Sequence, residues 1–189
     1  ILEGIVTTLQ DDGSPHFSPM GPRVDRPVTR LMLRPYRTSQ TYRNLKSRGA
    51  GVFHVIDDVE LMARAAIGKL ESVPPVAPAR CVPGVVLADA CRWFEFRVTE
   101  LDDAAERTTI ACEVIATGAG RDFFGFNRAK HAVLEAAILA TRVGILPAEQ
   151  IRAELARLVP LVEKTAGEQE RRAFDLLQRH LADVLPPVH

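Results

Sequence analysis

Hydroxyl and guanidinium side chains gather in one short polar segment of the sequence, residues 37–41. Such groups, together with free backbone N–H groups at the start of a helix, form a good cradle for phosphate. The same residue types can also mark no more than a capped helix start. The segment that we interpret as a phosphate-binding turn carries Arg37, Thr38, Ser39 and Thr41.

The charge around this turn favours the anion-binding interpretation. Residues 21–50 hold eight arginines and lysines against one acid, Asp25, whereas the whole chain balances 24 basic with 24 acidic residues. The alternatives are a solvated basic face or a weak nucleic-acid patch. Zero net charge and an aromatic content of 6% argue against a dedicated nucleic-acid-binding protein. We therefore rank nucleic-acid binding last.

The turn is expected to lie between a strand and a helix. Residues 28–34 lead into Pro35, which ends the strand because its ring cannot donate to a ladder. Ser39 can cap a helix that Gly49 closes, and residues 51–56 then resume as a strand. Further strands are predicted at residues 3–9, 16–20, 93–98 and 109–117, with a hairpin turn at residues 11–13.

These six predicted strands indicate an α+β, mainly β fold, a small closed or split six-stranded β-barrel in residues 1–122. Residues 123–189 are expected to form a C-terminal helical appendage, because apolar residues recur there at helical spacing. Asn127 caps its first helix, Pro147 begins the second, and a third follows. Pro160 is expected to break or kink the second helix.

Two segments between the strands receive simpler interpretations. A helix is expected after residue 57, where Asp57 and Glu60 resemble a capping box and Gly68 ends the helix. The proline-rich residues 72–89 are expected to form a long irregular connector.

Several functional classes find no support in the sequence. No apolar run approaches the roughly 20 residues that span a bilayer, and we see no signal peptide. Cys81, Cys91 and Cys112 lack metal-ligand spacing, which predicts reduced thiols, a cytoplasmic setting and no metal site. His16 and His54 invite a catalytic interpretation, but a strand histidine is more often a packed, hydrogen-bonded residue. The catalytic residues are therefore left unassigned.

Three sequence patterns together carry a family resemblance: the hairpin GIVTTLQDDGSPHFSPMG, the strand-turn-helix LRPYRTSQTYRNL and the strand VFHVIDD. They resemble the FMN-binding split-barrel superfamily of pyridoxamine-phosphate oxidases and flavin reductases. Within it, the chain is similar to an uncharacterised family that has counterparts of RPYRTSQTYRNL, VIDDVELMARAA and FNRAKHAVLEAAILATR. The resemblance covers nearly the whole chain. The turn departs from pyridoxamine-phosphate oxidases, because it holds no Ser-Arg-Lys triplet.

This resemblance implies a homodimer that binds FMN at the subunit interface and acts on a small molecule, with no nucleic-acid or membrane partner. The FMN phosphate would lie at the basic turn, with Arg34 or Arg43 assisting. The residues near the isoalloxazine ring would be His16, Ser18, Met20 and Gly21.

The leading hypothesis is an FMN-dependent oxidoreductase, in which the flavin carries the electrons. Because the family is associated with organisms that run tetrahydromethanopterin-linked one-carbon metabolism, a role in that metabolism is part of the hypothesis. The alternative is a non-catalytic binding module for a flavin, a deazaflavin or a pterin.

Overall fold

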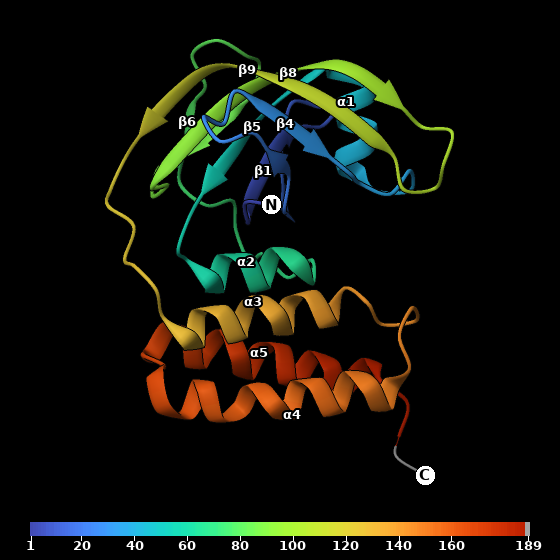
Figure 1. Ribbon diagram of the computed structural model, residues 1–189, viewed down its shortest axis with the longest axis vertical. Coiled ribbons are helices and arrows are strands. Elements are labelled where there is room, and N and C mark those ends of the chain that lie inside the picture. Colours follow the sequence, from blue (N-terminus) through green and yellow to red (C-terminus); the bar gives the residue numbers. More distant parts are fainter. Residues whose placement is uncertain (188–189) are drawn as a thin grey trace. The chain divides into compact units, whose positions relative to one another are not determined.

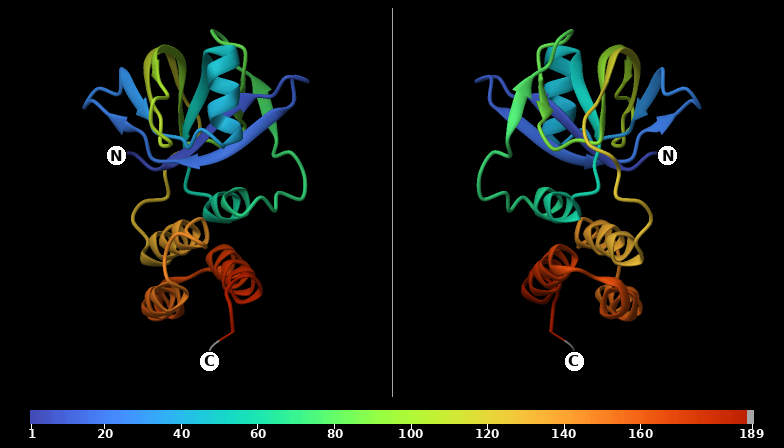
Figure 2. Two further views of the ribbon diagram at one scale, coloured as in Figure 1. Left: turned by 90° about the vertical axis from the view of Figure 1, so that its right-hand side faces the viewer. Right: turned by 90° about the vertical axis from the view of Figure 1, so that its left-hand side faces the viewer.

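The computed structural model describes residues 1–187, which divide into two compact units (Figures 1 and 2). The first, here called the sheet unit, comprises residues 1–56 and 72–123. The second, called the helical unit, comprises residues 57–71 and the chain from residue 124 onward. The segment 57–71 thus groups with the C-terminal helices although it lies between strands in the sequence.

The sheet unit is built on one curled, seven-stranded antiparallel sheet (Figure 1). Its strands run in the order β2-β1-β5-β8-β9-β4-β3, and β2 and β3 at the two ends share no ladder within residues 1–187. The sheet is therefore an open half-barrel. The strands are β1 (Gly4–Leu9), β2 (Pro15–Met20), β3 (Arg23–Val24), β4 (Arg30–Leu33), β5 (Ala50–Val55), β8 (Arg92–Asp102) and β9 (Thr109–Ala119).

The prediction of six strands was wrong by one, because the chain forms β3 directly after the corner at residues 21–22. In β3, Arg23 pairs with Met32 and Val24 with Leu31. A two-residue strand carries too short an apolar pattern to be recognised before its partner is known. The α+β class of the fold is confirmed, whereas the barrel is open.

The expected irregular connector also contains regular structure. β6 (Val76–Pro78) and β7 (Val85–Leu87) form a two-stranded antiparallel sheet. Thr7 donates from its hydroxyl to the Val85 carbonyl over 2.7 Å, and this bond joins β7 to β1. The prolines that suggested an irregular segment are tolerated because a two-stranded sheet has only edge strands.

The helix α1 (Gln40–Arg48) follows the predicted turn and packs on the core of the sheet unit. Ser39 caps it, and Gly49 ends it in the left-handed conformation with φ of 64°, as predicted. Burial of the apolar side chains drives this packing. The core comprises Val6, Leu31, Leu33, Tyr42, Leu45, Phe53, Phe94, Phe96, Ile110 and Cys112.

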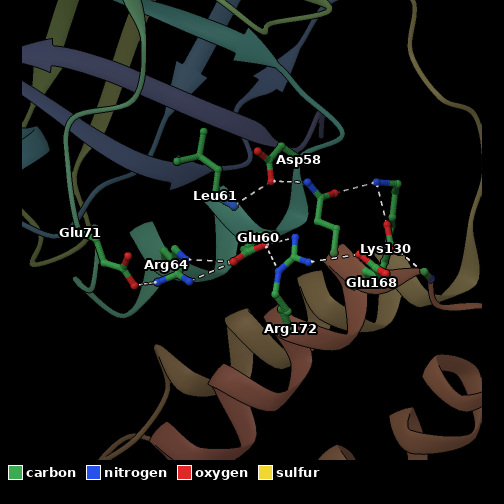
Figure 3. A network of polar contacts seen from close by, with 11 residues as sticks. Asp58, Glu60, Leu61, Arg64, Glu71, Lys130, Glu168 and Arg172 are labelled. Atoms are coloured by element: carbon green, nitrogen blue, oxygen red, sulfur yellow. Dashed lines mark hydrogen bonds and ion pairs between the residues drawn. The ribbon is translucent and has the colours of Figure 1, made fainter.

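The helical unit packs α2 with three longer helices around an alanine-rich core (Figures 1 and 2). Asn127 caps the first C-terminal helix as predicted, its side chain accepting from two backbone N–H groups. A polar network on α2 joins Glu60 to Arg64 and Arg172, each with an N–O distance of 3.0 Å (Figure 3). The helices are α2 (Val59–Ala66), α3 (Arg128–Ala140), α4 (Ala148–Thr165) and α5 (Glu168–Val184).

Two local predictions in this unit were wrong in whole or in part. The side chain that caps α2 belongs to Asp58, which accepts from Leu61 N over 2.9 Å, whereas the Asp57 carboxylate accepts from Phe124 N. α4 continues through Pro160, so the expected break is absent, while the alternative of a kink stays a prediction. The helix tolerates this proline because Ala156, whose carbonyl loses its N–H partner, lies on the exposed face and can bind water.

Candidate anion-binding site

The first turn of α1 contains both groups that bond within the protein and hydrogen-bond donors that do not. Ser39 N donates to Tyr36 O over 2.9 Å, and the Ser39 hydroxyl accepts from Tyr42 N over 3.2 Å. The backbone N–H groups of Gln40 and Thr41 have no partner within residues 1–187. Their positive dipole ends suit an anion.

Thr41 adds a hydroxyl to this turn in an unusual setting. The residue is only 1% exposed, yet its hydroxyl makes no hydrogen bond to any part of residues 1–187. Its oxygen must still touch solvent, because every fully enclosed side-chain nitrogen or oxygen in the described chain has a partner. A hydroxyl that solvent reaches and that no protein group binds can donate to a ligand, so Thr41 is suited to contact one.

The guanidinium groups of the turn fall into two kinds. Arg34 and Arg37 are exposed, and their guanidinium groups form no hydrogen bond or ion pair within residues 1–187. Arg43 instead braces the turn, donating from Nη1 to Thr38 O over 2.8 Å and from Nη2 to Gln40 Oε1 over 2.8 Å. Arg34 and Arg37 are therefore available to an anion, and Arg43 already has a structural role.

The loop between β8 and β9 holds the turn in place from the other side. Arg37 N donates to Glu106 O over 2.9 Å. The backbone N–H and the hydroxyl of Thr108 both donate to Pro35 O, over 3.0 Å and 2.8 Å. Because Thr108 is fully buried, these bonds fix the backbone that leads into the turn.

Arg107 in this loop is a candidate residue that the sequence analysis missed. Its Nε donates to Arg34 O over 3.3 Å, and its guanidinium lies over the ring of Tyr36, 5.4 Å from the centroid. The pairing register of β4 with β9 is the signal that could have placed Arg107 beside the turn. Leu33 pairs with Ile110, and three residues further along each strand this register places Tyr36 opposite Arg107.

Asp103 connects the same loop to the body of α1. Its carboxylate accepts from the Tyr42 hydroxyl over 2.6 Å and from Lys46 Nζ over 2.7 Å. These hydrogen bonds, with a smaller contribution from the charge of Arg37, lower the pKa of Asp103 to about 2. The carboxylate therefore stays ionised at neutral pH and orients α1 relative to the loop.

On β2, His16 lies close enough to Arg43 of α1 for the arginine charge to act on it. His16 pairs with Thr8 on β1, and the Thr8 hydroxyl accepts from Asn44 Nδ2 of α1 over 2.9 Å. Burial lowers the pKa of His16, and the nearby Arg43 charge lowers it further. A neutral imidazole beside α1 can donate or accept one hydrogen bond, depending on its tautomer.

The other residues predicted near a flavin ring lie further along β2. Ser18 and Met20 pair with Val6 and Gly4, and Met20 packs against the core. Gly21 follows β2, where an added Cβ would meet the Glu3 side chain at 2.7 Å. No bond within residues 1–187 joins these three residues to the turn, so their role at a flavin ring stays a prediction.

The other groups considered from the sequence have structural surroundings. His54 is buried and bonded to the backbone on both sides. All three cysteines are free thiols, and burial raises the pKa of Cys112 to about 12. Within residues 1–187 no cluster of His, Cys, Asp or Glu could hold a metal ion, and no helix is long and apolar enough to cross a membrane.

The curled antiparallel half-barrel with a helix after β4 is a split-barrel fold, which the chain shares with solved structures of flavin-binding proteins. Residues 2–121 match the N-terminal domain of a family described as protein of unknown function (DUF447), and residues 127–179 match the family's C-terminal part. The chain belongs to this family. The expected membership of an uncharacterised family is thereby confirmed. No curated protein matches the sequence.

Solved structures share the fold. An FMN-bound DUF447 protein, MM1853 from Methanosarcina mazei, is 22% identical with a TM-score of 0.81, over 94% of this chain and 93% of that one. An FMN-binding protein from Thermus thermophilus is 11% identical with a TM-score of 0.55, over 64% and 72%. The NADH:FAD oxidoreductase SgcE6 from Streptomyces globisporus is 12% identical with a TM-score of 0.51, over 62% and 76%.

Proposed function

We propose that the protein binds FMN, with the phosphate held at the first turn of α1, and acts as a flavin-dependent oxidoreductase on a small molecule. The observation that carries the proposal is the set of unused donors in this turn. They are the backbone N–H groups of residues 40 and 41, the Thr41 hydroxyl, and the guanidinium groups of Arg34 and Arg37. The shared fold with an FMN-bound protein over 94% of the chain supports the choice of ligand.

The residues present suit a phosphate monoester. Its two negative charges call for cations and several N–H or O–H donors, which the turn offers in one place. The Ser39 hydroxyl uses a lone pair as the helix cap, so its own proton is still available to a ligand. Thr38 is exposed beside it. The loop from Asp103 to Thr108 fixes the backbone of the turn, which limits the ordering cost of binding.

Bound flavin would supply the electron transfer, which no side chain of this turn can provide. The chain's own residues would hold and orient it: Arg37, Thr38, Ser39 and Thr41 at the phosphate, with Arg34 beside them. We extend the proposal to the ring, with His16, Ser18, Met20 and Gly21 along or just after β2 as its neighbours. No general acid or base is assigned.

The assembly and the division of labour along the chain belong to the same proposal. We propose a homodimer with FMN at the subunit interface, and an FMN-binding domain in residues 1–122 followed by a helical subdomain in residues 123–189. A role in pterin-linked one-carbon metabolism is a hypothesis that rests on the family resemblance. Size-exclusion chromatography with light scattering, with and without FMN, tests the dimer.

The proposal is tested by comparing FMN with riboflavin, which lacks the phosphate. Wild-type protein should bind FMN at about one per subunit and riboflavin at least about tenfold more weakly, because each charge-assisted contact contributes about 1.5–3 kcal/mol. Arg37→Ala should lose most of this preference. The matched control Arg157→Ala removes an exposed arginine of α4 and should keep it. Equal affinity for both flavins in the wild-type protein would contradict the placement of the phosphate.

Catalysis is tested separately, with FMN bound and oxygen excluded. Bleaching of the flavin absorbance by NADH or NADPH would support an oxidoreductase. Tight flavin binding without reduction by either donor would favour the non-catalytic binding module. Tighter binding of a deazaflavin or a pterin than of FMN would reassign the ligand while leaving the site in place.

A further inference from the structure

We infer that Arg107, in the loop between β8 and β9, is a ligand-binding residue that contacts the same anion as Arg37 and gives the site its preference for phosphorylated flavin. This inference rests on the proposed function. If Arg107 binds the ligand, the β8–β9 loop contacts the ligand in addition to holding the turn in place. Three independent features of the loop carry the inference.

The first feature is that Arg107 is held in place with most of its donors unused. Its Nε donates to Arg34 O, and its guanidinium plane rests on Tyr36. The two terminal amino groups have no partner within residues 1–187, and the side chain is exposed, so a ligand can reach them. A guanidinium that is already ordered loses little rotamer freedom when it binds, so its remaining N–H groups are preorganised for an anion.

The second feature is its position relative to the turn. Tyr36 pairs with Arg107 across an isolated bridge, and Arg37 N is bonded to Glu106 O. Burial alternates along this strand extension: Pro35 is buried, while Arg34 and Tyr36 are exposed. Arg34, Tyr36 and Arg107 therefore lie on one face, directly before the turn that holds the free N–H groups.

The third feature is a group of three arginines without a direct ion pair. Arg34, Arg37 and Arg107 lie in two paired segments, and none has an ion-pair partner within residues 1–187. Of the nearby acids, Asp103 is bonded to Tyr42 and Lys46. Glu106 is exposed and forms no ion pair within those residues. A bound dianion would supply a direct ion-pair partner that these three guanidinium groups do not have within the described residues.

The test is the ratio of FMN affinity to riboflavin affinity, measured by flavin fluorescence. Arg107→Ala should weaken FMN binding about tenfold or more and leave riboflavin binding unchanged, while Arg107→Lys should keep part of the preference. The matched control is Arg30→Ala, an exposed arginine of β4 without a side-chain partner in the described residues. Urea denaturation of each variant shows whether the loop is still folded.

Two results would overturn the inference. One is that Arg107→Ala binds FMN like Arg30→Ala; if Arg37→Ala still loses the preference, the proposed function stands without Arg107. The other is an equal loss for FMN and riboflavin, which would make Arg107 a structural residue. If the wild-type protein binds no flavin, calorimetry with inorganic pyrophosphate tests whether the site binds an anion at all. Pyrophosphate binding that Arg107→Ala weakens would support an anion site containing Arg107, with a ligand other than flavin. No pyrophosphate binding would contradict both the proposed function and the role of Arg107.

Discussion

The hydroxyl of Tyr42 donates to the carboxylate of Asp103 over 2.6 Å, across 61 positions of sequence. Tyr42 is buried on the inner face of α1, and Asp103 lies where β8 turns towards β9. Lys46 donates to both groups, so one small network joins the helix to the loop. The loop that holds Arg107 is thereby tied to the helix whose first turn forms the candidate anion site.

Replacing Tyr42 with Phe should loosen this connection without emptying the core, because the ring stays in place. We expect a lower urea midpoint and faster amide exchange in residues 103–108, since the Asp103 carboxylate loses an ordered donor. The matched control is Tyr36→Phe, because the Tyr36 hydroxyl has no hydrogen bond within residues 1–187. Unchanged exchange in the loop of Tyr42→Phe would show that Lys46 and the bonds to the backbone of residues 34–37 hold the loop without this hydroxyl.

His54 should make the stability of the sheet unit depend on pH. Its Nδ1 lies 3.1 Å from Ile5 O, and its Nε2 accepts from Leu87 N over 3.2 Å, so the neutral ring bonds β1 and β7 at once. Burial lowers its pKa from 6.5 to about 4. Protonation would give Nε2 a hydrogen facing the Leu87 N–H group and remove that bond.

The direction of this dependence follows from the lower pKa in the folded state. As the pH falls below 6.5, the unfolded chain takes up the proton first, so stability decreases until about pH 4 and then levels off. The total contribution of His54 is about 3 kcal/mol at 1.36 kcal/mol per pKa unit. His54→Gln should reduce the dependence in this window and leave the share of His16, whose pKa burial also lowers. His131→Gln, exposed on α3, should retain it.

Signals that act over a few residues were predicted correctly from the sequence. Ser39 and Asn127 cap helices because a side-chain oxygen can reach the N–H groups two or three residues ahead. Gly49 ends α1 because only glycine enters the left-handed region without strain. The phosphate-binding turn stays a prediction, which a local pattern suffices to make because its donors are adjacent in the sequence.

Features that depend on distant pairing were missed. Arg107 meets Arg34 across 73 positions, and that meeting follows from the register of β4 with β9, which no local pattern fixes. β3 and the pair β6–β7 are likewise defined by their partners.

Pro160 shows the opposite effect: a strong local signal is overridden because the neighbouring apolar side chains of α4 pack against the helical core.

Gly118 should be intolerant of a side chain because of Trp93, the only tryptophan in the sequence. The two residues pair across β8 and β9, and a Cβ on Gly118 would lie 2.0 Å from the indole ring. Gly118→Ala should shift the tryptophan fluorescence and destabilise the sheet unit by about 1–3 kcal/mol. In a double-mutant cycle with Trp93→Leu, most of that cost should disappear. A full cost in the absence of the indole would mean that the strain lies elsewhere.

The ion pair between Lys130 and Glu170 should be the most sensitive polar contact of the helical unit. The two groups lie 2.9 Å apart with side chains only 12% and 8% exposed, and Lys130 also donates to Asp57 O over 2.7 Å. Lys130→Met leaves a buried carboxylate without its cation, so we expect a loss of about 3 kcal/mol in the free energy of unfolding. The matched control lies on α5, the helix of Glu170, where Glu168 is 96% exposed and 3.9 Å from Arg172 (Figure 3). Glu168→Gln should change stability by less than about 0.5 kcal/mol, because exposed pairs contribute little. Urea denaturation followed by circular dichroism measures both, and equal losses would show that burial does not set the strength of these pairs.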